Sequence, residues 1–104
     1  MTRSRERGQR PYQARALRLL GEVSARRDAP EHAHGRYRDA LALAEELEMR
    51  PLVARCHLGL GTLARRAGSR PLAEDHVAAA TAMFHEMGMP FWLAQAESAA
   101  GSQE

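Results

Sequence analysis

The segment PLVARCHLGLGTLARRAGSRPLAEDHVAAATAMFHEMGMP, at residues 51–90, decides the fold because it has the pattern of one complete helix–turn–helix unit. Pro51 suits the first turn of a helix, where its missing N–H has no hydrogen bond to make. Gly68 and Gly88 lie where a helix commonly ends in a left-handed residue. The segment therefore predicts two helices that are separated by a turn at Gly68 and followed by a second turn at Gly88.

The same pattern occurs forty residues earlier in the chain. Sliding the sequence by forty positions matches identical residues in both predicted helices. The matched pairs are Ala14 with Ala54, Arg15 with Arg55, Leu20 with Leu60, Gly21 with Gly61, Arg26 with Arg66, Ala33 with Ala73, Ala40 with Ala80, Ala42 with Ala82, Glu46 with Glu86 and Met49 with Met89. Self-similarity at a fixed spacing of about 20–50 residues indicates a stacked repeat array.

The repeat divides the chain into five parts. They are a flexible basic arm at 1–10, a first repeat at 11–50, a second repeat at 51–89, a half repeat or capping helix at 90–100 and a tail at 101–104. Apolar residues at helical spacing predict helices over 11–27, 31–48, 51–67 and 70–87, and a fifth helix from Pro90. Because so short an array usually needs neighbours, we expect Leu20, Phe91 and Trp92 to contact a second copy of the chain or further repeats.

The spacing of small and apolar residues gives the chain a family resemblance. The residues that carry it are Ala54, His57, Leu60-Gly61, Gly68, Ala73, Val77 and Ala80, and in the earlier copy Ala14, Leu17, Leu20-Gly21, Ala33, Tyr37 and Ala40-Leu41. This pattern resembles a tetratricopeptide repeat, and the long repeat is similar to those in large bacterial multidomain signalling ATPases, cyclases and transcriptional regulators. The resemblance implies an all-α α-solenoid of antiparallel helix hairpins, about five helices in all, that acts in protein–protein interaction.

Composition agrees with one small helical domain. The chain has 104 residues, of which 44% are hydrophobic and only 5% aromatic, so the core should consist of leucine and alanine rather than large rings. No apolar run is long enough to span a bilayer, and the first residues lack the apolar segment of a secretory signal. We therefore expect a cytoplasmic protein without a membrane-bound part. The single cysteine, Cys56, cannot form an internal disulfide.

The charges of the predicted helices separate into two layers. The first helices, 11–27 and 51–67, carry seven arginines against one glutamate, a net charge of +6. The second helices, 31–48 and 70–87, carry three arginines against eight carboxylates, a net charge of −5. The resemblance implies that the first helices line a concave groove, which would be basic and would bind an acidic peptide or partner surface through arginine–carboxylate pairs. The groove residues that it implies are Arg15, Arg18, Glu22, Arg26, Arg55, Leu58, Thr62, Arg65 and Arg66.

The positions of several of these arginines can also be explained without any ligand. Arg26, Arg65 and Arg66 lie in the last turns of predicted helices, where a cation interacts favourably with the helix dipole. Glu22 and Thr62 stand where the carboxylate-binding members of the family have asparagine, so the resemblance does not extend to that specificity. A negative Glu22 would repel a terminal carboxylate.

The sequence contains no constellation typical of catalysis, of a metal site or of a bound cofactor. Cys56 and His57 are neighbours on a helix and point about 100° apart, so they cannot form a local thiolate–imidazole pair. His57 has the position of a packed interface residue. His32 and His34 lack a third ligand at metal spacing.

These observations favour a non-catalytic module that binds protein partners. The alternative is a self-association module that sets the oligomeric state of a signalling or regulatory protein. Nucleic-acid binding is disfavoured, because the net charge is only +2 and aromatic residues do not alternate with the basic ones.

Overall fold

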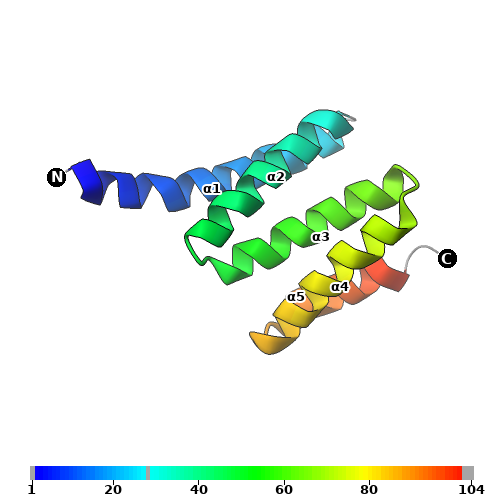
Figure 1. The fold of residues 1–104 in the computed structure, drawn as a ribbon. Helices are drawn as coiled ribbons and strands as arrows, with labels where there is room; N and C mark the ends of the chain where they lie inside the picture. Colours follow the sequence, from blue (N-terminus) through cyan, green and yellow to red (C-terminus); the bar gives the residue numbers. More distant parts are fainter. Residues whose placement is uncertain (1, 28, 102–104) are drawn as a thin grey trace.

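The chain folds into a row of helix hairpins. The structure, a computed structural model, describes the backbone of residues 2–27 and 29–101 and the side chains of residues 10–27 and 29–98. Within these residues there are five helices and no strand: α1 (Thr2–Arg26), α2 (Pro30–Glu46), α3 (Arg50–Arg66), α4 (Arg70–Glu86) and α5 (Pro90–Gly101). Each helix packs against the next one in the sequence (Figure 1). The predicted all-α solenoid of helix hairpins is therefore confirmed.

The helices recur with a regular spacing. Helices α2, α3, α4 and α5 begin at residues 30, 50, 70 and 90, and each has a proline at its first or second position. Gly68 and Gly88 follow α3 and α4 with φ angles of 84° and 65°, which confirms the predicted left-handed turns. In the first of them, the N–H of Gly68 donates to the carbonyl of Arg65 (3.0 Å) and the N–H of Ser69 to that of Ala64 (2.8 Å). These two bonds close the helix end as a Schellman motif.

The turn after α2 has the same form without a glycine. Glu48 takes a φ of 59°, and its N–H donates to the carbonyl of Glu45 at 3.1 Å. Helix α2 therefore ends at Glu46, two residues earlier than the sequence predicts. The difference arises because no glycine marks the end of α2 in the sequence, so the helical pattern continues past the real end.

The start of α1 also differs from the sequence prediction. The helix begins at Thr2 and includes Pro11, whereas residues 1–10 were expected to be a flexible arm. Arginine, glutamate and glutamine are good helix formers, and the helix continues through Pro11 although an interior proline costs about 3 kcal/mol. This first part of α1 extends past the end of α2 (Figure 1). Met1 and residues 102–104, which belong to the predicted arm and tail, lie outside the described residues.

The core is built mostly from small side chains. Among the described residues, the fully buried alanines are Ala14, Ala33, Ala40, Ala44, Ala54, Ala80 and Ala96. Phe84, Leu60 and Cys56 are the largest side chains that are fully buried. Because alanine leaves little side chain between two backbones, the helices of each hairpin and of neighbouring hairpins pack closely.

Glycines allow the closest helix contacts. A Cβ atom at Gly61 would lie 2.8 Å from Cγ2 of Val77 and 3.3 Å from the carbonyl oxygen of Ala73, so α3 and α4 approach each other closely at this position. A Cβ at Gly21 would lie 3.2 Å from the ring of Tyr37, and a Cβ at Gly59 would lie 2.5 Å from it. The Tyr37 ring of α2 thus lies between α1 and α3, and it fixes the spacing of the two basic helices.

An ion pair between the two helices of a hairpin also recurs after forty residues. Arg10 of α1 lies 2.6 Å from Glu46 of α2, and Arg50 of α3 lies 2.6 Å from Glu86 of α4. Both pairs join the two helices of one hairpin and occupy equivalent positions in the repeat. Because all four side chains are exposed, each pair adds at most about 1 kcal/mol to stability. Their value here is to confirm that the two hairpins have the same internal geometry.

Candidate functional site

A cavity of about 250 Å³ opens between helices α1, α3 and α5. It is lined by seven of the nine residues that the family resemblance implies, namely Arg18, Glu22, Arg26, Arg55, Leu58, Thr62 and Arg66. Tyr37 of α2 and Trp92 of α5 also line it, and the sequence did not predict either of them as a groove residue. Four arginines surround the cavity with one glutamate, so its wall has a net charge of +3. We call this surface the basic cavity.

The two other predicted groove residues lie elsewhere. Arg15 lines an adjoining cavity of about 410 Å³, which shares Arg18 and Arg55 with the basic cavity. Arg65 lines a groove between α4 and α5 instead. Its neighbour Arg66 lines the basic cavity, and consecutive residues on a helix point about 100° apart, so the two cannot share a wall. Assigning Arg65 to the groove together with Arg66 is therefore not supported by the geometry.

Glu22 holds two of the arginines in place. Arg18 Nη1 lies 3.3 Å from Glu22 Oε1, and Arg26 Nη2 lies 3.1 Å from Glu22 Oε2. Both partners are one helical turn from Glu22, a spacing that favours such pairs. Arg66 Nη1 donates to the carbonyl oxygen of Ala25 at 3.4 Å, which joins α3 to α1. The carboxylate of Glu22 therefore neutralises charge at the α1 side of the cavity, whereas Arg55 and Arg66 bring positive charge from α3.

Arg55 has the most unusual surroundings of these residues. Its Cζ atom lies 4.3 Å from the centroid of the Trp92 ring, a cation–π geometry. Its Nε atom is buried and has no hydrogen-bond partner among the described residues. Burial lowers the pKa of Arg55, and the positive charge of Arg18 lowers it further. The guanidinium group is therefore held against an aromatic ring in the wall of the cavity.

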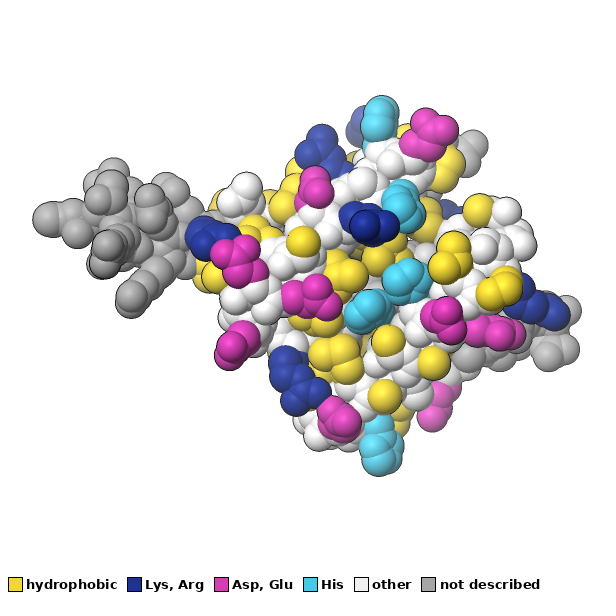
Figure 2. All heavy atoms as spheres, viewed as in Figure 1, with side chains coloured by type: hydrophobic (Ala, Val, Ile, Leu, Met, Phe, Trp, Pro, Cys, Tyr) yellow, Lys and Arg dark blue, Asp and Glu magenta, His cyan; other side chains and the backbone are white. Residues whose placement is uncertain are grey.

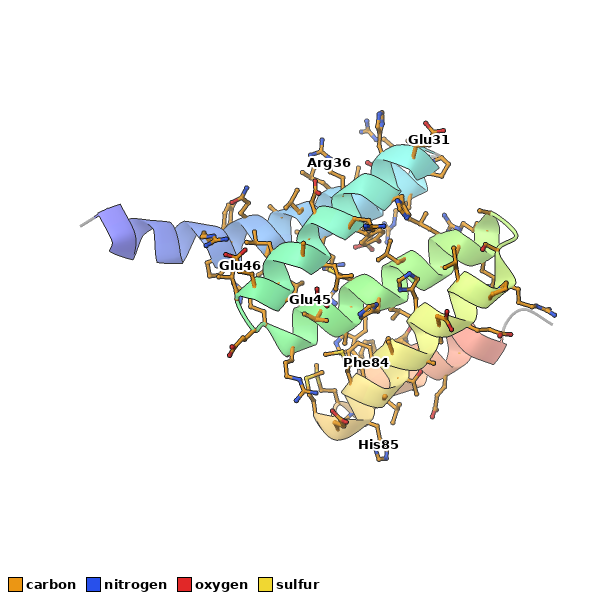
Figure 3. The ribbon with its side chains drawn as sticks, in the orientation of Figure 1. Glu31, Arg36, Glu45, Glu46, Phe84 and His85 are labelled. Atoms are coloured by element: carbon orange, nitrogen blue, oxygen red, sulfur yellow. The ribbon has the colours of Figure 1, made fainter. Side chains whose placement is uncertain are left out.

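Aromatic packing inside the chain accounts for Trp92. Its ring stacks on Phe84 of α4 with centroids 6.0 Å apart. The Phe91 ring makes an edge-to-face contact with it, with centroids 5.2 Å apart. Figure 3 shows Phe84 on α4. Trp92 was predicted as a self-association residue, but these contacts and Arg55 engage it within the chain. Phe91 and Leu20, predicted for the same role, are exposed.

Thr62 is tied to its own helix. Its hydroxyl donates to the carbonyl oxygen of Leu58 at 3.0 Å, one turn earlier. Because the single hydroxyl hydrogen is used in this bond, Thr62 can only accept a hydrogen bond from a molecule in the basic cavity. Leu58 adds an apolar contact to the same wall.

A histidine pair lies between α3 and α4. The Nδ1 atoms of His57 and His76 are 3.1 Å apart, and their rings are 5.3 Å apart. Figure 2 shows histidine side chains together on the face formed by α2, α3 and α4. Burial lowers the pKa of both rings, and the charge of His57 lowers that of His76 further. His57 is a packed interface residue, as predicted, but its partner was missed because the two are nineteen residues apart.

The described residues provide little for other chemistry. Burial raises the pKa of the Cys56 thiol to about 11, so the reactive thiolate form is rare near neutral pH. No group of three potential metal-binding side chains occurs in the part of the chain that the structure describes. Of the helices built from described residues, none combines the length and the apolar character needed to cross a bilayer.

Comparisons of the chain with protein-family models, with curated proteins and with solved structures give no match. The basic cavity is therefore interpreted from its own geometry and charge.

Proposed function

We propose that the chain is a non-catalytic, tetratricopeptide-like interaction module that binds an acidic peptide in the basic cavity. The observation that carries the proposal is the convergence of arginines from two different helices on one cavity, beside an aromatic ring. Guanidinium groups bind carboxylates through two parallel hydrogen bonds, which makes acidic side chains the matching ligands.

The position of Glu22 limits where a ligand carboxylate can bind. Its two oxygens face Arg18 and Arg26, so an acidic group near α1 would meet a negative charge. The side chains of Arg55 and Arg66 come from α3, where no acidic residue lines the cavity. We propose that two carboxylates of the peptide bind Arg55 and Arg66, which lie about three turns apart on α3, and that an apolar side chain next to them contacts Leu58 and Trp92.

The test is a titration with a fluorescein-labelled hexaglutamate peptide, followed by fluorescence anisotropy at low and physiological salt. Replacing both Arg55 and Arg66 by glutamine should weaken binding at least about tenfold, because each hydrogen bond to a charged group contributes about 1.5–3 kcal/mol. The matched control replaces Arg36 and Arg70, which are exposed on α2 and α4, and removes the same charge. Figure 3 shows Arg36 on α2, and neither Arg36 nor Arg70 lines the basic cavity.

Nonspecific attraction to a basic protein would give a different result. Both double variants would then weaken binding by the same factor, since each removes two positive charges. That outcome, or the absence of binding at low salt, would rule out the basic cavity as the ligand site.

A further inference from the structure

Helix α1 has an apolar row that no other described element covers. Tyr12, Leu20 and Val23 are 73%, 44% and 46% exposed, and Ala16 lies between them at helical spacing. We call these four residues the α1 row. Single exposed apolar residues are common on proteins, but a continuous row along one helix face marks a surface that binds another chain.

The repeat shows what such a row does when it is covered. Forty residues later, the equivalent side chains on α3 are Leu52, Leu60 and Leu63, which are only 6%, 2% and 7% exposed. They are buried against α2, where Leu52 packs with Ala40 and Ala44, and Leu60 and Leu63 pack with Ala33 and Tyr37. The α3 row is therefore one half of a helix–helix interface. The α1 row has apolar side chains at the same positions, although only Leu20 is identical to its equivalent, Leu60.

We propose that the α1 row binds an acidic amphipathic helix of another polypeptide, in the position that α2 holds on α3. Residues 10–27 carry five arginines and one glutamate; Arg10 pairs with Glu46, and Arg18 and Arg26 pair with Glu22. The exposed Arg15 and Arg27 therefore supply most of the positive charge that a helix lying on α1 meets. Helix α2 (Pro30–Glu46), which covers the α3 row, carries four carboxylates against two arginines. Within the chain, an acidic helix, α2, thus already covers the apolar row of an arginine-bearing helix, α3.

A second copy of the chain is a poorer occupant. Two α1 helices in contact would bring their arginines together, and like charges repel across an interface. The apolar faces of α2 and α4 in a second copy are already buried inside that copy. An acidic helix with an open apolar face therefore fits the row better than α2 or α4 of a second copy does.

One position of α1 adds a steric requirement. On α3 the ring of Tyr37 passes over Gly59, where an added Cβ would lie 2.5 Å from the ring. The equivalent position on α1 is Leu19, which is exposed. A helix docked on α1 therefore cannot carry an aromatic residue at this position and needs alanine or glycine there.

The test uses a fluorescein-labelled synthetic peptide with the sequence of residues 30–47 and alanine in place of Tyr37. The peptide should bind the protein with saturation, and Leu20→Glu should weaken binding at least about tenfold, since it puts a charge where an apolar side chain is buried. Val23→Ser, a milder change, should weaken binding as well. Leu72→Glu, which changes an exposed leucine on α4, is the matched control and should have no effect.

Two further peptides test charge and shape. The peptide that keeps its tyrosine, and a peptide whose carboxylates are replaced by arginine, should both bind more weakly. Variants in which Arg55 and Arg66 are replaced should bind the helix normally, which separates this surface from the basic cavity. Equal binding by wild type and Leu20→Glu, or no saturation at millimolar peptide, would overturn the proposal. So would a protein that is dimeric on its own by light scattering and becomes monomeric with Leu20→Glu, because a second copy would then cover the row.

Discussion

Replacing Gly59 by alanine tests how Tyr37 separates the two basic helices. The new Cβ would lie 2.5 Å from Cε1 and Cζ of Tyr37 and 3.0 Å from its hydroxyl oxygen, well inside contact distance. The ring cannot move away freely, because it is buried and faces Gly21 of α1 on its other side. Overpacking of this kind costs about 1–3 kcal/mol. Alanine also stabilises a helix by about 1 kcal/mol relative to glycine. We therefore expect Gly59→Ala to lower the free energy of unfolding by about 0–2 kcal/mol.

The matched control is the same substitution at Gly35 of α2. A Cβ there would meet nothing within 4 Å, so Gly35→Ala should raise the free energy of unfolding by about 0.5–1 kcal/mol. The two variants should therefore differ by about 1–3 kcal/mol in urea unfolding followed by circular dichroism at 222 nm. If Gly59→Ala stabilised the protein as much as Gly35→Ala, the close contact between Tyr37 and α3 would be refuted.

The other predictions concern the turns, the histidine pair and the core. Glu48→Gly should raise the unfolding free energy by about 1 kcal/mol and Gly88→Ala should lower it by a similar amount, because a left-handed φ strains residues with a Cβ; thermal melting checks both. Burial lowers the pKa values of His57 and His76 below 6.5, so the unfolded chain binds more protons and stability should fall as the pH drops below about 6.5. His57→Gln should flatten that fall in urea titrations from pH 7.5 to 5. Phe84→Ala, at a fully buried position, should cost about 3–5 kcal/mol in the same assay; a cost below 1 kcal/mol would contradict the packing around Trp92.

Local signals explain why the helices could be predicted from the sequence. Pro51, Gly68 and Gly88 act within a few residues of the helix ends that they mark, and the structure has those ends within one or two residues of the prediction. The end of α2 was missed because Glu48 adopts the left-handed conformation without the residue type that signals it. The first turns of α1 were missed because a proline and a basic sequence suggested an arm.

The candidate site depends on contacts that the sequence does not encode locally. The resemblance to a repeat family implied that Arg18, Arg55 and Arg66 share one groove, and all three line the same cavity. It could not show that Trp92 supports Arg55, since that contact joins α3 to a helix of the incomplete third unit. The sequence also could not show which of Arg65 and Arg66 faces the cavity. That depends on the rotation of α3 about its axis, which is set by the packing of the helices.

The central claim is that arginines of α1 and α3 form one ligand surface with Trp92. The most direct measurement is an NMR titration of the ¹⁵N-labelled protein with hexaglutamate, which follows the arginine Nε–H and tryptophan indole signals. We expect the Arg55, Arg66 and Trp92 signals to shift and to saturate together, with the Arg36 signal unchanged. Equal shifts for arginines on α2 and α4, or no shift at Arg55, would contradict it.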